Sequence, residues 1–236
     1  MKEKRIECLN GVKDSIAIAL GYLSVSFSFG MLAAQGGLPV WAAVAISMTN
    51  LTSAGQFAGM NLMLSSASLF EIGVTTLVIN LRYMLMSLSL SQKIEHMPLV
   101  KRMIIAFGIT DEIFTVSSTK DRTLSFWYLA GLILLPYIGW ATGTLLGACA
   151  GGVLPDAVTS AMGIMLYAMF LAIIIPASKK QKSVAVIVLC AVILSCILKY
   201  TPMLNRISSG WAIIIVTLVA SALGATLFPR REEDAL

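Results

Sequence analysis

The sequence contains few charged residues. Asp, Glu, Lys and Arg make up 12% of its 236 residues, while hydrophobic residues make up 58%. Soluble domains carry about 25% charged residues, so this chain lacks the polar surface that keeps a domain in water. Several apolar runs approach or exceed the roughly 20 residues that cross a bilayer. The sequence therefore predicts an all-α, polytopic membrane helix bundle that forms a single integral-membrane domain over residues 1–236.

Residues that support catalysis or metal binding are also scarce. The only histidine, His96, lies outside the apolar segments, so no serine within them has a histidine base beside it. The four cysteines show no metal-ligand spacing, and no phosphate-binding or dinucleotide fingerprint is present. The net charge of +5 is typical of a membrane protein with cytoplasmic Lys and Arg. We therefore expect no enzymatic activity, no cofactor, no metal and no nucleic-acid partner.

Eight apolar segments can be marked along the chain. Two of them are interrupted by polar residues, and short loops separate them all. The segments cover residues 14–35, 41–64, 71–90, 103–119, 124–149, 157–176, 184–199 and 208–228. The N-terminal segment is too long for a secretory signal, so we interpret it as a first transmembrane helix.

The distribution of basic residues distinguishes two topologies. If all eight segments span and the N-terminus is cytoplasmic, Lys93, Lys101, Arg102, Lys199 and Arg206 lie outside. If 41–64 and 103–119 each enter and leave on one side, only Lys199 and Arg206 remain outside. Because cytoplasmic loops are rich in Lys and Arg, the second topology is favoured. We expect six full spans plus two re-entrant or broken segments, with eight spans as the alternative and both termini cytoplasmic.

The stretch from Thr49 to Gln56 puts polar side chains inside an apolar segment. Unpaired polar groups in hydrocarbon cost several kcal/mol each, so they must face protein, water or a ligand. Even an unbroken helix would align several of them on one face. We interpret the stretch as one wall of a substrate site, the alternative being a hydrogen-bonded seam between helices. The candidate substrate-binding residues here are Thr49, Asn50, Thr52, Ser53 and Gln56.

The segment 71–90 carries an arginine within an apolar run, Asn80-Leu81-Arg82. An Arg at mid-membrane costs about 2.5–3.5 kcal/mol on insertion scales and usually marks a functional site. Asn80 and Arg82 lie about 200° apart around an ideal helix, so both face one cavity only if the helix unwinds. We predict that both bind substrate, Arg82 through a carboxylate. The alternative is a structural ion pair between Arg82 and Asp111 or Glu112.

Two adjacent carboxyl groups, Asp111 and Glu112, follow Gly108-Ile109-Thr110 in the fourth segment. Buried carboxyl groups near an arginine are suited to binding an ammonium group or exchanging a proton. We therefore assign proton coupling or ammonium binding to them. If the segment is only an interfacial helix, both are solvated acids.

Glycines recur every fourth residue at Gly139, Gly143, Gly147 and Gly151. Small residues at this spacing let helix backbones approach closely. The strip is a packing surface, either within the bundle or against a second subunit of a higher oligomer.

Several short motifs resemble the AzlC family. They are Ile18-Ala19-Leu20-Gly21-Tyr22 continuing to Phe29-Gly30-Met31-Leu32-Ala33, then Ser53-Ala54-Gly55-Gln56-Phe57, Asn80-Leu81-Arg82-Tyr83 and Thr110-Asp111-Glu112. Their order and spacing agree across the first 120 residues. Two departures occur, since the family often has Gly-Ala-Ser-Gln in place of Ser53–Gln56 and His in place of Tyr83.

The resemblance implies a permease of the bacterial inner membrane that exports branched-chain amino acids such as valine, leucine and isoleucine. It also implies a small membrane partner of the AzlD family. From the sequence we expect a secondary transporter that works by alternating access and is coupled to protons. The alternatives are a channel-like pore for small zwitterions and a structural subunit of a transport complex.

Overall fold

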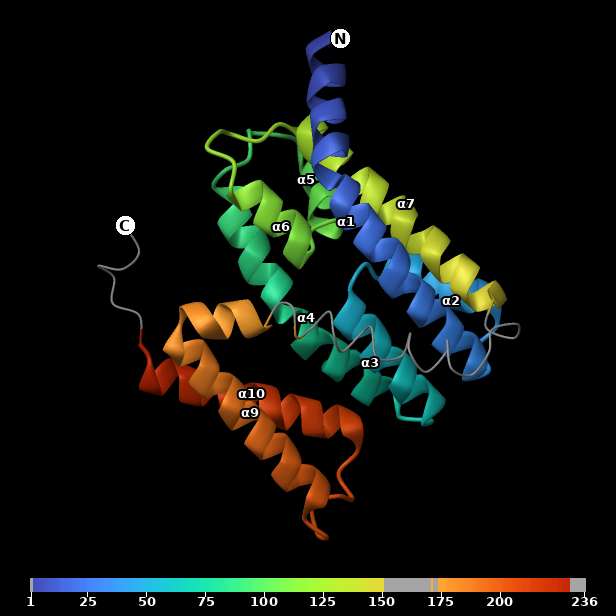
Figure 1. The fold of residues 1–236 in the computed structure, drawn as a ribbon, viewed down its shortest axis with the longest axis vertical. Helices are drawn as coiled ribbons and strands as arrows, with labels where there is room; N and C mark the ends of the chain where they lie inside the picture. Colours follow the sequence, from blue (N-terminus) through green and yellow to red (C-terminus); the bar gives the residue numbers. More distant parts are fainter. Residues whose placement is uncertain (1, 151–170, 172–173, 230–236) are drawn as a thin grey trace. The chain divides into compact units, whose positions relative to one another are not determined.

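The computed structural model describes residues 2–150, 171 and 174–229, and Figure 1 shows the helices that they form. The chain divides into two compact units. The first comprises Met1–Met60 with Asn80–Leu166, and the second comprises Asn61–Ile79 with Tyr167–Leu236. All residues of the candidate site lie in the first unit.

Five helices in the described part of the chain are long and apolar enough to cross a membrane. They are α1 (Lys2–Gln35), α4 (Leu69–Ser91), α7 (Phe126–Ala150), α9 (Lys182–Tyr200) and α10 (Ser209–Leu227). The expected polytopic helix bundle is thereby confirmed. Helix α1 begins at Lys2, well ahead of the apolar segment 14–35, so the polar residues before that segment belong to the same helix. Most of the predicted segment 157–176 lies outside the described residues.

The two segments predicted to be interrupted are each broken into two short helices. Residues 41–64 form α2 (Val40–Thr49) and α3 (Ser53–Leu64), with the break at residues 50–52. The fourth segment forms α5 (Leu99–Phe107) and α6 (Asp111–Ser118), with the break at residues 108–110. Pro39 precedes α2 and Pro98 precedes α5. Proline has no backbone N–H, and at the start of a helix this group would have no partner within the helix. Both breaks coincide with polar clusters of the sequence.

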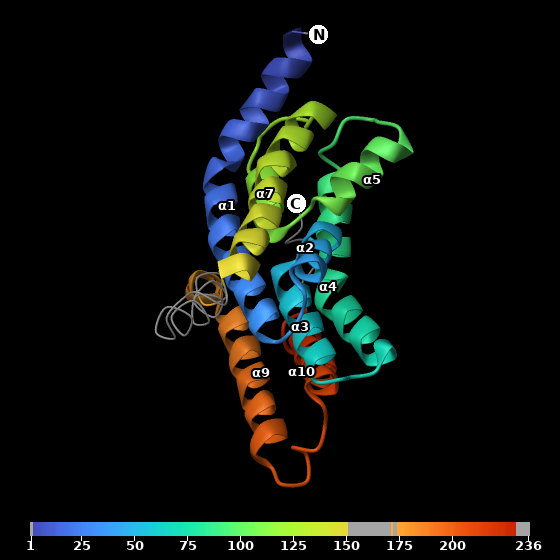
Figure 2. The ribbon, with the colours of Figure 1, turned by 90° about the vertical axis from the view of Figure 1, so that its right-hand side faces the viewer.

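Helices α1 and α7 lie side by side in both views (Figures 1 and 2). The glycine strip of α7 faces the α1 backbone. A β-carbon on Gly139 would lie 2.9 Å from the Ala19 carbonyl oxygen, and one on Gly147 would overlap the Phe27 carbonyl. The strip therefore packs within the bundle, which is one of the two alternatives that the sequence left open. Gly151 lies outside the described residues.

Ion pairs tie α1 to the segment that leads into α7. Arg122 Nη1 lies 2.9 Å from Glu7 Oε1, and Lys120 Nζ lies 2.8 Å from Asp14 Oδ2. The Tyr128 hydroxyl also donates to Asp14 at 2.7 Å. These contacts hold the N-terminal part of α1 against the start of α7, next to the apolar contact between the two helices.

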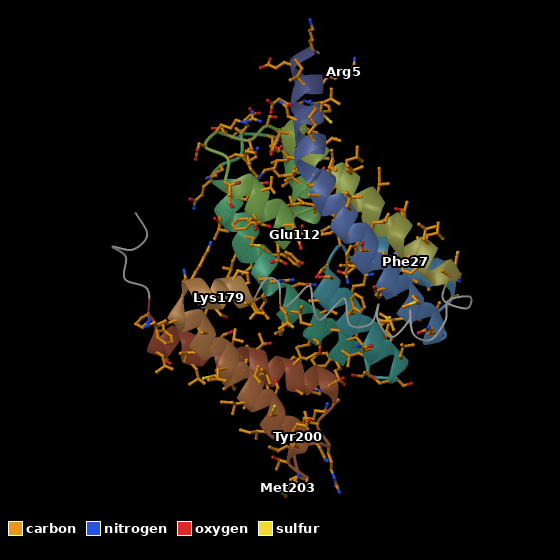
Figure 3. The ribbon with its side chains drawn as sticks, in the orientation of Figure 1. Arg5, Phe27, Glu112, Lys179, Tyr200 and Met203 are labelled. Atoms are coloured by element: carbon orange, nitrogen blue, oxygen red, sulfur yellow. The ribbon has the colours of Figure 1, made fainter. Side chains whose placement is uncertain are left out.

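In the second unit, α9 and α10 form a helical hairpin. Tyr200 ends α9 and Met203 lies in the connection, and the side chains of both, labelled in Figure 3, are exposed. Gly224 of α10 faces the side chain of Ile187 of α9. Many aliphatic residues of both helices remain exposed, among them Leu189 and Val192, as expected of helices that face hydrocarbon.

Candidate functional site

The broken segment α2–α3 folds back on itself. Gln56 Nε2 donates to Ser47 Oγ at 2.6 Å, although nine residues separate them. In one straight helix those residues would lie about 13 Å apart along the axis. The chain therefore turns at residues 50–52, and the continuous polar stripe expected of an unbroken helix does not form.

A buried hydrogen-bond network holds this turn against α7. Gln56, which is 1% exposed, accepts from Trp140 Nε1 at 3.1 Å. Ser47 Oγ lies 2.6 Å from Thr144 Oγ1. Because buried polar groups without partners are costly, this satisfied network fixes the position of the turn. Both polar ends of the Gln56 side chain are engaged by protein.

The broken segment α5–α6 also folds back. Lys93, which precedes this segment, contacts both the end of α6 and the chain beyond it. Leu124 N donates to Lys93 O at 2.8 Å, and Lys93 Nζ donates to Ser118 O at 2.6 Å. A straight helix over residues 99–118 would separate its ends by about 30 Å. At the break, a β-carbon on Gly108 would lie 2.7 Å from Ile133 Cδ1, so glycine permits the turn to pack against α7.

A charged contact joins α4 to the second of these turns. Arg82 Nη1 lies 2.8 Å from Asp111 Oδ2, with both side chains about one-third exposed. Helix α4 is continuous through this region, so Asn80 and Arg82 occupy different faces. The Arg82–Asp111 ion pair offered as an alternative from the sequence is therefore present. Its partial exposure leaves the guanidinium accessible to a second anion.

Glu112, labelled in Figure 3, contacts α1 instead. The Tyr22 hydroxyl donates to Glu112 Oε2 at 2.6 Å and lies 2.6 Å from Thr110 Oγ1. Thr110 in turn caps α6 by accepting from Ile113 N. Both carboxyl groups stand in the first turn of α6, where the helix dipole favours negative charge.

The turn at residues 50–52, the turn at residues 108–110 and α4 line a small, open cavity of about 140 Å³. The first turn contributes Thr49–Thr52, and the second contributes Ala106, Phe107 and Ile109. Asn80 and Tyr83 of α4 complete the wall. Thr52 Oγ1 donates to Asn80 Oδ1 at 3.0 Å, which links the first turn to α4. Polar side chains thus occupy one side of the cavity and apolar side chains the other.

The predicted site residues fall into three groups. Thr49, Asn50, Thr52 and Asn80 line the cavity. Arg82, Asp111 and Glu112 form charged contacts at the second turn. Ser53 begins α3 half-buried, and Gln56 belongs to the network beneath the first turn.

Several residues at the site were not among the candidates. Tyr83 and Ile109 line the cavity, Tyr22 binds Glu112, and Trp140 binds Gln56. The helical spacing of Asn80 and Tyr83 was the available signal for Tyr83. Tyr22 and Trp140 are far from their partners in the sequence, and no local pattern marks them.

Comparison with known proteins identifies the family of this chain. A family model described as AzlC protein matches residues 17–154, more than half of the chain. The chain belongs to the AzlC family. The matched range contains both turns, Arg82 and the α1–α7 contact.

Three relatives illustrate the range of the family. The inner membrane protein YgaZ of Escherichia coli K12 is 30% identical over 186 residues, covering 75% of this chain and 76% of that protein. An uncharacterized membrane protein of Archaeoglobus fulgidus is 34% identical over 169 residues, 70% and 74% of the two chains. The branched-chain amino acid transport protein AzlC of Bacillus subtilis is 22% identical over 171 residues, 71% and 66%. No solved structure matches this AzlC-family chain.

Proposed function

We propose that this chain is a secondary transporter that exports branched-chain amino acids across the bacterial inner membrane by alternating access. The observation that carries the proposal is the cavity at which both helix breaks meet α4. Broken helices commonly build the substrate site of secondary transporters, because their free backbone groups and helix ends can bind ions and polar ligands. The relative named as a branched-chain amino acid transport protein supports the substrate class.

The chemistry around the cavity suits an amino acid. Arg82 lies outside the cavity lining, on a different face of α4 from Asn80, and would bind the substrate carboxylate at the second turn, exchanging part of its contact with Asp111. Asp111 or Glu112 would then bind the ammonium group or take up a coupling proton. Thr49, Asn50, Thr52 and Asn80 supply polar contacts, with Ser53 adjacent, while Ile109 and Phe107 supply an apolar wall. Gln56 would act indirectly, by holding the first turn.

A second cavity supports entry from the cytoplasm. It measures about 410 Å³ and shares Ala106 and Ile109 with the small cavity. Its other walls include Met97, Met103 and Arg102 from the loop and helix at residues 94–103. This loop is cytoplasmic in the re-entrant topology, so the two cavities would form successive parts of one route.

The re-entrant topology is part of the proposal, with both termini cytoplasmic. Two folded-back segments support it, since the ends of α5–α6 meet and the first turn reverses the chain. Within the second unit, Ser208 Oγ also donates to Glu71 Oε1. These residues lie on the same side of the membrane if both segments re-enter, and on opposite sides if both span.

Labelling of single cysteines tests this topology. In a variant lacking the native cysteines, Ser66→Cys should react with an impermeant maleimide in intact cells, and Glu95→Cys should react only after lysis. The reverse pattern would establish eight spans. Both positions are exposed, so differences in accessibility within the protein do not complicate the comparison.

Transport is tested in proteoliposomes, with and without a small AzlD-type subunit. We expect saturable counterflow of labelled leucine, valine and isoleucine, and export measured as uptake into inside-out vesicles. Unsaturable flux without counterflow would indicate a pore. A flux no greater than in empty vesicles, with or without the partner, would indicate a structural subunit.

A further inference from the structure

A second buried carboxyl group lies in the other unit, on the first turn of α4. Glu71 is 8% exposed, although the two residues before it, Leu69 and Phe70, are largely exposed. It accepts a hydrogen bond from the Ser208 hydroxyl. Ser208 is the N-cap residue of α10, and its hydroxyl contacts Glu71 instead of capping its own helix. The carboxylate therefore stands at the positive end of the α10 dipole.

An unpartnered hydroxyl group completes this site. Thr75, one helical turn after Glu71, is fully buried, and its Oγ1 has no hydrogen-bond partner among the described residues. A β-carbon placed on Gly210 would lie 2.5 Å from Glu71 Oε1 and 2.7 Å from Thr75 Oγ1. The absence of a side chain at Gly210 therefore lets α10 pack closely against both oxygens. A buried hydroxyl without a partner is costly, and an O–H on the neighbouring carboxyl group would supply the missing hydrogen bond.

The groups that face Glu71 serve a carboxyl group in either protonation state. From α10 they are the Ser208 hydroxyl and the backbone at Gly210, and from α4 they are Thr75 and Ser68, whose Oγ accepts from Glu71 N. The ion pairs found among the described residues do not include Glu71. Ionised Glu71 accepts from Ser208. Protonated Glu71 has an O–H to donate, and Thr75 Oγ1, one turn further along α4 and unpartnered among the described residues, is the hydroxyl that we expect to accept it.

We propose that Glu71, Thr75 and Ser208 form a proton-binding site at the extracytoplasmic end of α4, where the coupling proton enters during export. The role rests on the proposed transporter and its topology. A proton from the outer solution reaches the exposed Ser208 and adds to the Glu71 carboxylate. The resulting O–H is free to donate to the unpartnered Thr75 hydroxyl, and the same proton passes to water when the carboxyl group ionises again. The step consumes and releases one proton and requires no other reactant.

The first test observes the proton itself on the purified protein. In the infrared difference spectrum between acidic and alkaline buffer, we expect a protonated carboxyl band that Glu71→Gln removes and that Glu95→Gln, an exposed control, retains. Ser208→Ala should shift the frequency of this band, because the carboxyl group loses a hydrogen-bond partner. Thr75→Val should also shift the frequency of this band, because the hydroxyl beside the carboxyl group is lost.

The second test separates coupling from binding. In Glu71→Gln, whose amide oxygen still accepts from Ser208, we expect leucine counterflow to persist while accumulation driven by a pH gradient falls at least tenfold. Gradient-driven accumulation equal to that of the wild type, or an unchanged carboxyl band, would overturn the proposal. If the wild-type protein transports no amino acid, the proposed function fails, while the infrared result still reports whether Glu71 binds a proton.

Discussion

Arg82 Nη1 lies 2.8 Å from Asp111 Oδ2, so the one arginine within an apolar span is paired with the first residue of α6. The pair is about one-third exposed, and Arg82 also donates to the Tyr83 hydroxyl at 3.2 Å. An arginine held in this way presents a planar, always charged group at the second turn. Its several donors allow it to keep one carboxylate while binding another.

Replacing Arg82 with Lys should reduce transport about tenfold or more, with little loss of stability. Lysine keeps the positive charge but has no planar fork, and one charge-assisted hydrogen bond contributes about 1.5–3 kcal/mol. Leucine flux in proteoliposomes and the midpoint of thermal unfolding are the measurements. Arg206→Lys, in an exposed loop, is the matched control. Unchanged flux would exclude Arg82 from substrate binding.

Ala106→Phe should block the proposed route between the two cavities. Ala106 lines both of them, and its side chain is exposed, so the larger ring fills open space without displacing the core. We expect flux to fall about tenfold, with an unfolding midpoint within a few degrees of the wild type. Ile104→Phe, on the exposed surface of the same helix, should transport normally. Equal activity of the two variants would rule out this route.

Gln56→Leu should destabilise the protein by about 1–3 kcal/mol, because Trp140 Nε1 loses its buried acceptor. The expected result is a lower midpoint of thermal unfolding in detergent. Asn61→Leu alters an exposed position later in α3 and should leave the midpoint unchanged. A stable Gln56→Leu variant that loses transport would instead mean that Gln56 contacts the substrate directly.

Gly147→Leu should prevent α7 from packing against α1. A side chain at this position overlaps the Phe27 backbone, which cannot move aside easily. We expect little monodisperse protein after solubilisation. Gly21→Leu provides the comparison, since nothing lies within 4 Å of the position of its β-carbon. Equal yields of the two variants would contradict tight packing of the glycine strip.

Local chemistry was sufficient to predict the class of protein and the positions of the helix breaks. Low charge and long apolar runs require a membrane bundle whatever the tertiary contacts are. Polar clusters at Thr49–Gln56 and Gly108–Glu112 mark places where a helix in hydrocarbon must find partners, and both segments break there. Helical spacing alone also predicts that Arg82 and Asn80 lie on different faces of α4.

Only the tertiary structure decided which partner each polar group has. Gln56 shares its sequence cluster with Thr52, yet it binds Trp140 while Thr52 binds Asn80 at the cavity. Tyr22 reaches Glu112 across ninety positions of sequence. Such pairs depend on how folded-back segments pack against α1, α4 and α7, and spacing within one segment carries no information about that packing. The sequence determined that polar groups interrupt two helices, and the three-dimensional packing determined which of them face the cavity.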